Sequence, residues 1–160
     1  MFFMKYVLVI FTLAFISIGS NIASVSKSVT SVAMKSHGAA TYYVEGEILG
    51  AGPVDMMVDT GSGYSTINEH TLSILKKNGK ASYKKDLIGI LANGKKMQVE
   101  VYTLSAINIG GSCWLRNVDA AVFPGKTRQI LGLSALGKTS PFTFSMDPPE
   151  LLLSNCKKQL

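Results

Sequence analysis

The residues best suited to chemistry are Asp59, Thr60, Gly61 and Ser62, which follow the apolar segment 54–58. The segment is expected to form a strand, so the acid stands where a strand ends and a glycine-containing turn begins. Backbone N–H groups and hydroxyl groups of such a turn can hold a carboxylate in one orientation, as the activation of a water molecule requires. The structural alternative is an aspartate that only caps its own turn, a common use of Asp-x-Gly sequences.

Two other patterns suggest phosphate binding, and we expect neither to be functional. Residues 132–139 match the phosphate-loop pattern GxxxxGK[ST], but such a loop needs a following helix, and Ser140, Pro141 and the strand-like 142–144 come next. The turn at Asp59 is also similar to the phosphate-binding turn of actin and the sugar kinases. Those folds are duplicated and much longer than this chain.

The segments around Asp59 predict an all-β domain. Strands are expected at 42–49, 54–58, 64–67, 87–91, 97–104, 107–109, 114–118, 120–123, 129–133, 142–146 and 151–153. One short helix is expected between Asn68 and Gly79, with Asn68 as its N-cap. Asn93-Gly94 favours a tight type I′ hairpin, because both central residues of that turn need positive φ. Short strands with a single helix indicate a barrel or a sandwich.

Taken together, these features resemble the retropepsin-like aspartic proteases, in particular the small bacterial forms with a single motif. The resemblance rests on the strand before Asp59, on Ser62 after it, on the Asn-Gly hairpin, and on Ile130-Leu131-Gly132 near the C-terminus. It covers roughly residues 41–153. It implies an all-β acid-protease barrel with one short helix and one lobe in each chain.

The resemblance also implies roles for single residues. Asp59 would be the catalytic aspartate, and Thr60 would interlock with its mate across a dimer. Gly61 would allow a tight backbone path, and Ser62 would hydrogen-bond the outer carboxylate oxygen. The tip of a flap over bound peptide would comprise Leu91, Ala92, Asn93 and Gly94. The segment packed behind the catalytic loop would comprise Ile130, Leu131 and Gly132.

This type of peptide hydrolysis needs two carboxyl groups, one ionised and one protonated. Two carboxyl groups ~3 Å apart adopt this state because they cannot both be ionised, so they share one proton. The chain supplies one suitable motif, since Asp55 lies within a strand, Asp86 and Asp119 lack a glycine turn, and Asp147 precedes two prolines. No internal repeat is visible. We therefore expect an aspartic endopeptidase that acts on peptide or protein substrates as a homodimer, with a mildly acidic optimum. The alternative is a catalytically silent module of the same fold that holds a peptide.

The N-terminal region has the pattern of a targeting segment. Residues 1–23 predict a signal peptide or an N-terminal membrane anchor, because a short positive region precedes the apolar run 6–18. Both possibilities place the rest of the chain outside the cytoplasm, as an exported protein that is periplasmic, secreted or tethered to the membrane. Residues 24–40 are expected to be a linker or pro-segment, and 41–160 to be the protease domain.

The composition excludes other classes of function. The 160 residues include 16 Lys and Arg and 10 Asp and Glu, for a net charge of +6, but the basic residues are dispersed, so no nucleic-acid partner is expected. Two His and two Cys do not have zinc-site spacing, and we expect no metal and no cofactor. Cys113 and Cys156 could form a disulfide in an oxidising compartment, and the sequence leaves this open.

Overall fold

The structure is a computed structural model that describes residues 28–91 and 93–160. Its elements, in chain order, are β1 (Thr30–Ala33), β2 (Lys35–Ser36), β3 (Tyr42–Ile48), β4 (Gly52–Val58), β5 (Ser65–Asn68), α1 (Glu69–Lys77), β6 (Ala81–Ile90), β7 (Lys96–Ile109), β8 (Cys113–Phe123), β9 (Gln129–Leu131), α2 (Leu133–Leu136), the 3₁₀ turn η1 (Gly137–Thr139), β10 (Phe142–Met146) and β11 (Pro149–Leu153). The predicted signal peptide or anchor at 1–23 and the flap residue Ala92 lie outside the described residues. Within the described ranges, no helix has the length and hydropathy needed to cross a bilayer.

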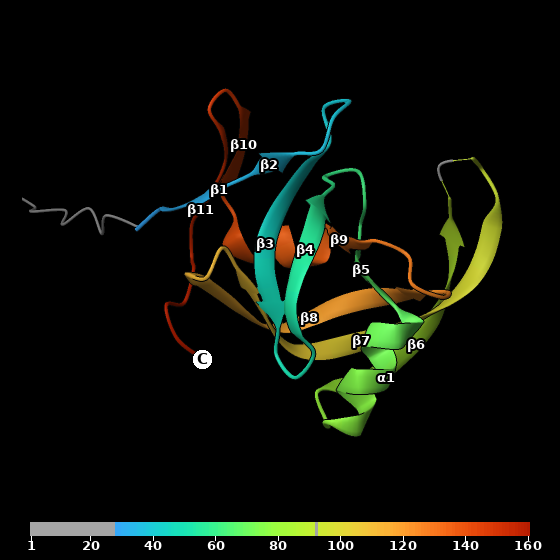
Figure 1. The fold of residues 1–160 in the computed structure, drawn as a ribbon. Coiled ribbons are helices and arrows are strands. Elements are labelled where there is room, and N and C mark those ends of the chain that lie inside the picture. The colour runs from blue at the N-terminus through green and yellow to red at the C-terminus, as the bar shows by residue number, and fades with distance from the viewer. Residues whose placement is uncertain (1–27, 92) are drawn as a thin grey trace, which may run out of the picture.

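A closed barrel forms most of the domain (Figure 1). The main sheet has the order β2-β3-β4-β9-β5-β8-β7-β6, and an additional pairing of β3 with β7 closes the ring. The predicted all-β barrel is therefore confirmed. β9 lies between β4 and β5 and runs parallel to β4, so that Val58 pairs with Leu131. This pairing brings residues 130–132 beside the residue that follows β4, which is Asp59.

The predicted helix is confirmed as α1. The Asn68 side chain accepts a hydrogen bond from Thr71 N–H at 2.8 Å, as an N-cap does, and Leu72 and Leu75 are buried against the barrel. The structure also contains α2, a helix of four residues that the prediction of a single helix missed. α2 and η1 occupy the phosphate-loop-like stretch, where Thr139 is fully buried and its hydroxyl donates to Leu136 O.

Four of the predicted strands are joined in pairs into two longer strands. The predicted strands 97–104 and 107–109 are one strand, β7, and the predicted strands 114–118 and 120–123 are one strand, β8. The intervening residues stay in the sheet because their partners continue, as in the pairing of Ala106 with Arg116. Polar residues on the outer face of a barrel do not interrupt the ladder, so composition alone does not mark the end of a strand.

The hairpin between β6 and β7 is present, but its turn differs from the expected two-residue turn. Leu91 N–H donates to Lys95 O at 2.9 Å, and Gly94 N–H donates to Leu91 O at 2.8 Å. Residues 92–94 therefore separate the bonded pair Leu91 and Lys95. Gly94 has φ +77°, the left-handed conformation that glycine tolerates best.

The folded domain begins earlier than the boundary predicted near Thr41. β1 pairs with β11, which pairs with β10, and these form a second sheet of three strands. Val32 and Met34 are buried in the same core as the barrel residues Val44 and Ile48. The sequence did not reveal this strand because two alternating apolar positions are too short a pattern to distinguish from a linker. Residues 30–33 and 35–36, within the segment predicted as a linker or pro-segment, are therefore paired strands.

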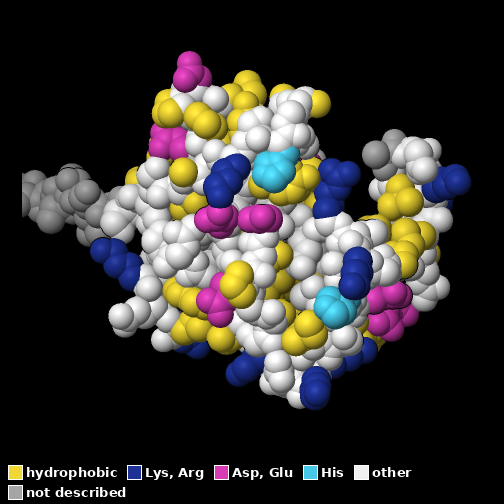
Figure 2. All heavy atoms as spheres, viewed as in Figure 1, with side chains coloured by type: hydrophobic (Ala, Val, Ile, Leu, Met, Phe, Trp, Pro, Cys, Tyr) yellow, Lys and Arg dark blue, Asp and Glu magenta, His cyan; other side chains and the backbone are white. Residues whose placement is uncertain are grey.

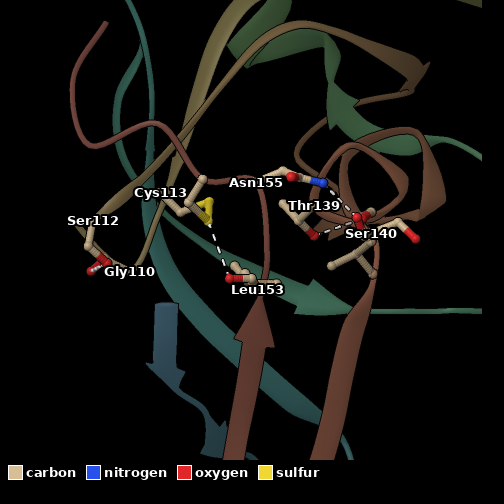
Figure 3. The surroundings of a disulfide bond; sticks show 9 residues. Gly110, Ser112, Cys113, Thr139, Ser140, Leu153 and Asn155 are labelled. Atoms are coloured by element: carbon tan, nitrogen blue, oxygen red, sulfur yellow. Dashed lines mark hydrogen bonds between the residues drawn. A yellow bond between two sulfur atoms is a disulfide. The ribbon is translucent and has the colours of Figure 1, made fainter. Parts of the chain in front are cut away.

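A disulfide joins Cys113, the first residue of β8, to Cys156 in the C-terminal tail (Figure 3). The Cα atoms of the two residues are 4.8 Å apart. Trp114 N–H also donates to Lys157 O at 2.9 Å, so the bond and the short bridge beside it fix the tail to the barrel. The pairing that the sequence left open is thus present in the structure.

Reducing this disulfide is expected to lower the free energy of unfolding by about 2–4 kcal/mol, because the closed loop restricts the unfolded chain. Urea unfolding of the protein with and without dithiothreitol measures the loss. A Cys113→Ala, Cys156→Ala double variant is the control, and its stability should not respond to dithiothreitol. A wild-type protein whose urea midpoint is the same in both conditions contradicts the prediction.

Candidate active site

Backbone hydrogen bonds hold the turn that carries Asp59. Asp59 N–H donates to Leu131 O at 3.1 Å, and Ser62 N–H donates to Asp59 O at 3.3 Å. Gly61 N–H donates to the Asp59 carboxylate oxygen Oδ1 at 2.9 Å. Asp59 is half-buried, so its carboxylate is oriented by the turn and still reaches solvent.

Glycine is suited to position 61 because of the nearby carboxylate. A Cβ atom on Gly61 would lie 3.2 Å from Asp59 Oδ1, closer than ordinary van der Waals contact. A side chain there would compete with the hydrogen bond from Gly61 N–H for the same space. Thr60 is exposed beside it on the turn, where the resemblance predicts a contact with a second subunit.

The Ser62 hydroxyl does not reach the carboxylate in the way the resemblance predicted. It donates to Tyr64 O at 2.7 Å. A hydroxyl has one hydrogen to donate, so in this single chain Ser62 stabilises the turn and leaves the carboxylate to Gly61. Ser62 O accepts a hydrogen bond from Leu133 N–H at 2.8 Å, which ties the turn to the start of α2.

Ile130, Leu131 and Gly132 lie directly behind the turn. Leu131 is fully buried, and Gly132 makes the closest approach. A Cβ atom on Gly132 would lie 2.3 Å from Tyr64 O and 2.8 Å from Ser62 O. Glycine is therefore required at 132 by the space available between β9 and the turn.

Sequence reasoning missed Ser134, which connects the back of the turn to two strands. Its hydroxyl donates to Asp119 O in β8 at 2.6 Å and accepts from Ser65 N–H in β5 at 2.7 Å. The Ser65 hydroxyl in turn accepts from Gly132 N–H at 3.2 Å. No sequence pattern marks Ser134, because its partners are 15 and 69 residues away along the chain.

A cleft of about 650 Å³ opens beside Asp59. One wall is the turn, with Asp59, Gly61 and Ser62, and the opposite wall is the β6–β7 hairpin, where hydrophobic side chains gather (Figure 2). Of the other predicted residues, Leu91 and Ile130 line the cleft, whereas Asn93 and Gly94 are exposed at the hairpin tip.

Several residues of the cleft walls were not identified from the sequence. Leu87 and Val99 are paired across β6 and β7, so their side chains share one face of the hairpin. With Phe123 of β8 they line the cleft and pack on a small cluster around Val101 and Ala121. The alternation of Leu87, Gly89 and Leu91 was a usable signal, but the face that it lines depends on the pairing with β7.

Asp59 is the only carboxylate among the described residues that line the cleft. Asp55 is exposed on β4, Asp86 is exposed on β6, and Asp147 is exposed after β10. A reaction that needs two carboxylates must therefore take the second one from another chain.

An ion pair outside the cleft braces the base of the hairpin. The register of β6 shifts between Tyr83 and Lys85, and the intervening Lys84 places its Nζ 2.5 Å from Asp119 Oδ2. Desolvation raises the pKa of Asp119, but hydrogen bonds from Lys84 and from the Thr103 hydroxyl outweigh it, and the net pKa is lowered. The pair links β6 to β8 across β7.

The pKa of Asp119 predicts how the ion pair depends on pH. A carboxyl whose pKa is depressed by folding adds stability above its unfolded pKa of about 3.9, and this is lost as pH falls through the folded pKa. Lys84→Gln should therefore lower the urea midpoint at pH 7 and have little effect at pH 2.5. Unfolding curves of both proteins at the two pH values test this. An equal loss at both pH values would assign the effect to packing rather than charge.

Gly132→Ala should displace the turn, because the added Cβ overlaps two carbonyl oxygens. We expect a loss of about 1–3 kcal/mol in the free energy of unfolding. Gly137→Ala is the matched control, since Gly137 has φ −60° and a Cβ there meets nothing within 4 Å. Thermal unfolding of the two variants should separate them clearly, and equal stability would show that the turn yields without strain.

Comparison with known proteins identifies the family. The family described as gag-polyprotein putative aspartyl protease matches residues 44–138. Of the solved structures, 29 chains match, among them a retropepsin-like aspartic protease from Rickettsia conorii with a TM-score of 0.56 and 22% identity, over 81% of this chain and 93% of that one. No curated protein matches the chain. The family match spans more than half of the sequence and includes the Asp59 turn, and the chain therefore belongs to this aspartyl protease family and has the retropepsin-like fold.

Proposed function

We propose that the protein is an aspartic endopeptidase that hydrolyses peptide bonds as a homodimer, with Asp59 of each subunit as the catalytic residue. The main support is the Asp59 carboxylate, which is oriented by Gly61 N–H and faces a cleft with no second carboxylate among its described lining residues. Two copies related by a two-fold axis would bring two such carboxylates together. The family to which the chain belongs agrees with this chemistry.

The two Asp59 carboxyls would divide the work of the reaction. Because they cannot both ionise at close range, one holds a proton and the other does not. The ionised carboxylate removes a proton from the attacking water as its oxygen bonds to the carbonyl carbon, and the protonated carboxyl donates a hydrogen bond to the carbonyl oxygen. Transfer of a proton to the amide nitrogen then allows the C–N bond to break.

The cleft would hold the substrate as an extended chain between the turn and the hairpin. The apolar side chains of Leu87, Val99 and Phe123 offer surface to apolar substrate side chains. Closure of the β6–β7 hairpin over the peptide would exclude bulk water from the carboxylate pair. The hairpin can serve this purpose because its tip is exposed while its base is braced by Lys84 and Asp119.

We also propose that the protein works outside the cytoplasm. The disulfide between Cys113 and Cys156 supports this, because such bonds persist in oxidising compartments. The apolar N-terminal run in the sequence agrees with export or with attachment to a membrane.

Replacement of Asp59 by Asn tests the activity. The purified full-length protein and the variant are incubated with an unbiased peptide mixture from pH 4 to 7, and products are identified by mass spectrometry. We expect Asp59→Asn to lower the cleavage rate roughly 10²–10⁴-fold, because the amide cannot accept a proton from water. Wild-type cleavage should rise with the dimer fraction measured by sedimentation.

Asp55→Asn is the matched control, since Asp55 is an exposed carboxylate on β4, the strand that leads to Asp59, and does not line the cleft. It should retain cleavage. A stable wild-type dimer with no cleavage that depends on Asp59 at any pH would favour a silent module that binds peptides through the same cleft.

A further inference from the structure

Arg128 is the only cationic side chain among the described residues that line the cleft. It lies in the segment between β8 and β9, immediately before the start of β9 at Gln129. The inference drawn from it concerns the choice of substrate and rests on the proposed peptidase function.

The residues on both sides of Arg128 are hydrogen-bonded to side chains of α1 and its cap. The Asn68 amide donates to Thr127 O at 2.8 Å, and Glu69 accepts a hydrogen bond from Gly125 N–H at 2.8 Å. On the other side, the Gln129 amide donates to the Thr71 hydroxyl at 2.9 Å. Arg128 therefore extends from a positioned segment, which lowers the entropic cost of holding a ligand.

Among the described residues, the hydrogen-bond partners of the Arg128 guanidinium are both neutral. Its Nη1 lies 3.5 Å from Tyr43 Oη and 3.6 Å from Met57 Sδ, and both contacts are long. The ion pairs found between described residues are Lys35–Glu45 and Lys84–Asp119, so neither involves Arg128. Most of its five N–H donors are thus available for a carboxylate, which the planar group can bind through two hydrogen bonds.

The contact with Met57 places the guanidinium close to the reacting centre. Met57 lies near the end of β4, Asp59 follows that strand two residues later, and both line the cleft. Their Cα atoms are therefore separated by roughly 7 Å, which is the length of about two residues of an extended peptide. A substrate side chain one or two positions from the scissile bond can reach Arg128.

The charge balance of the cleft favours an acidic substrate. In the dimer, the Asp59 pair carries one negative charge when it shares a proton, and two copies of Arg128 carry two positive charges. Lys85 adds a further positive charge nearby, with its Nζ 5.7 Å from the centre of the Tyr64 ring at the cleft wall. The geometry points to Arg128 as a specificity residue that selects polypeptides with an Asp or Glu side chain within about two residues of the scissile bond.

The first test is a ratio of rates. Cleavage sites in a randomised peptide pool are sequenced, and peptides with Glu at the enriched position are resynthesised with Gln. We expect kcat/KM to favour Glu roughly tenfold in the wild type, as a charged hydrogen bond at a solvated site allows. The ratio of kcat/KM for Glu peptides to that for Gln peptides should fall to about one in Arg128→Gln. In Arg128→Glu it should fall below one, and peptides with Lys at that position should become the preferred substrates.

Lys126→Gln is the control, because Lys126 is in the same segment but lines a different cavity. It should keep the preference for Glu. A Glu-to-Gln ratio near one in the wild type, a preference that survives in Arg128→Gln, or an equal loss in Lys126→Gln would each overturn the assignment.

A binding measurement separates this proposal from the peptidase proposal. Two fluorescein-labelled pools of random decapeptides are titrated with the full-length Asp59→Asn variant, one pool containing Asp and Glu and the other Asn and Gln in their place. Tighter binding of the acidic pool that disappears when Arg128→Gln is added supports the inference even in the absence of cleavage. Equal binding of the two pools refutes it, whatever the outcome of the cleavage test.

Discussion

The parallel pairing of β4 with β9 is the constraint on which the rest of the site depends. It places Leu131 O where Asp59 N–H can donate to it, and it brings Gly132 against the carbonyl oxygens of Ser62 and Tyr64. Parallel neighbours cannot be joined by a tight turn, and here the connection includes β5 to β8. The barrel is completed within this connection, where β7 pairs with β3.

The site lies between a side that backbone hydrogen bonds hold in place and a side that ends in an exposed tip. The Asp59 turn is held by backbone bonds to β9 and α2, whereas the opposing hairpin extends from the barrel and has an exposed tip. Orientation of a catalytic group benefits from rigidity, and admission of a polymer substrate requires an opening. Lys84 and Asp119 brace the hairpin at its base, away from its exposed tip.

The small sheet of β1, β11 and β10 and the disulfide serve a separate purpose. They cover the end of the barrel near Gly110, where a Cβ atom would lie 2.4 Å from the Val32 side chain. Val32, Met34, Leu151 and Leu153 extend the main core at this end. A chain of this size buries limited apolar surface, and a covalent tie between β8 and the tail compensates for it.

The sequence by itself determined most of the strands, helix α1 with its Asn68 cap, and the position of the hairpin, because each depends on residues close together in the chain. It also identified the Asp59 turn through its resemblance to the retropepsin-like proteases. Only the tertiary structure decided that residues 30–33 form a strand, that Cys113 bonds Cys156, that the Ser62 hydroxyl donates to Tyr64 O, and that Arg128 faces the cleft. These features depend on contacts between segments far apart in the sequence or on competition between nearby acceptors, and local patterns do not encode either.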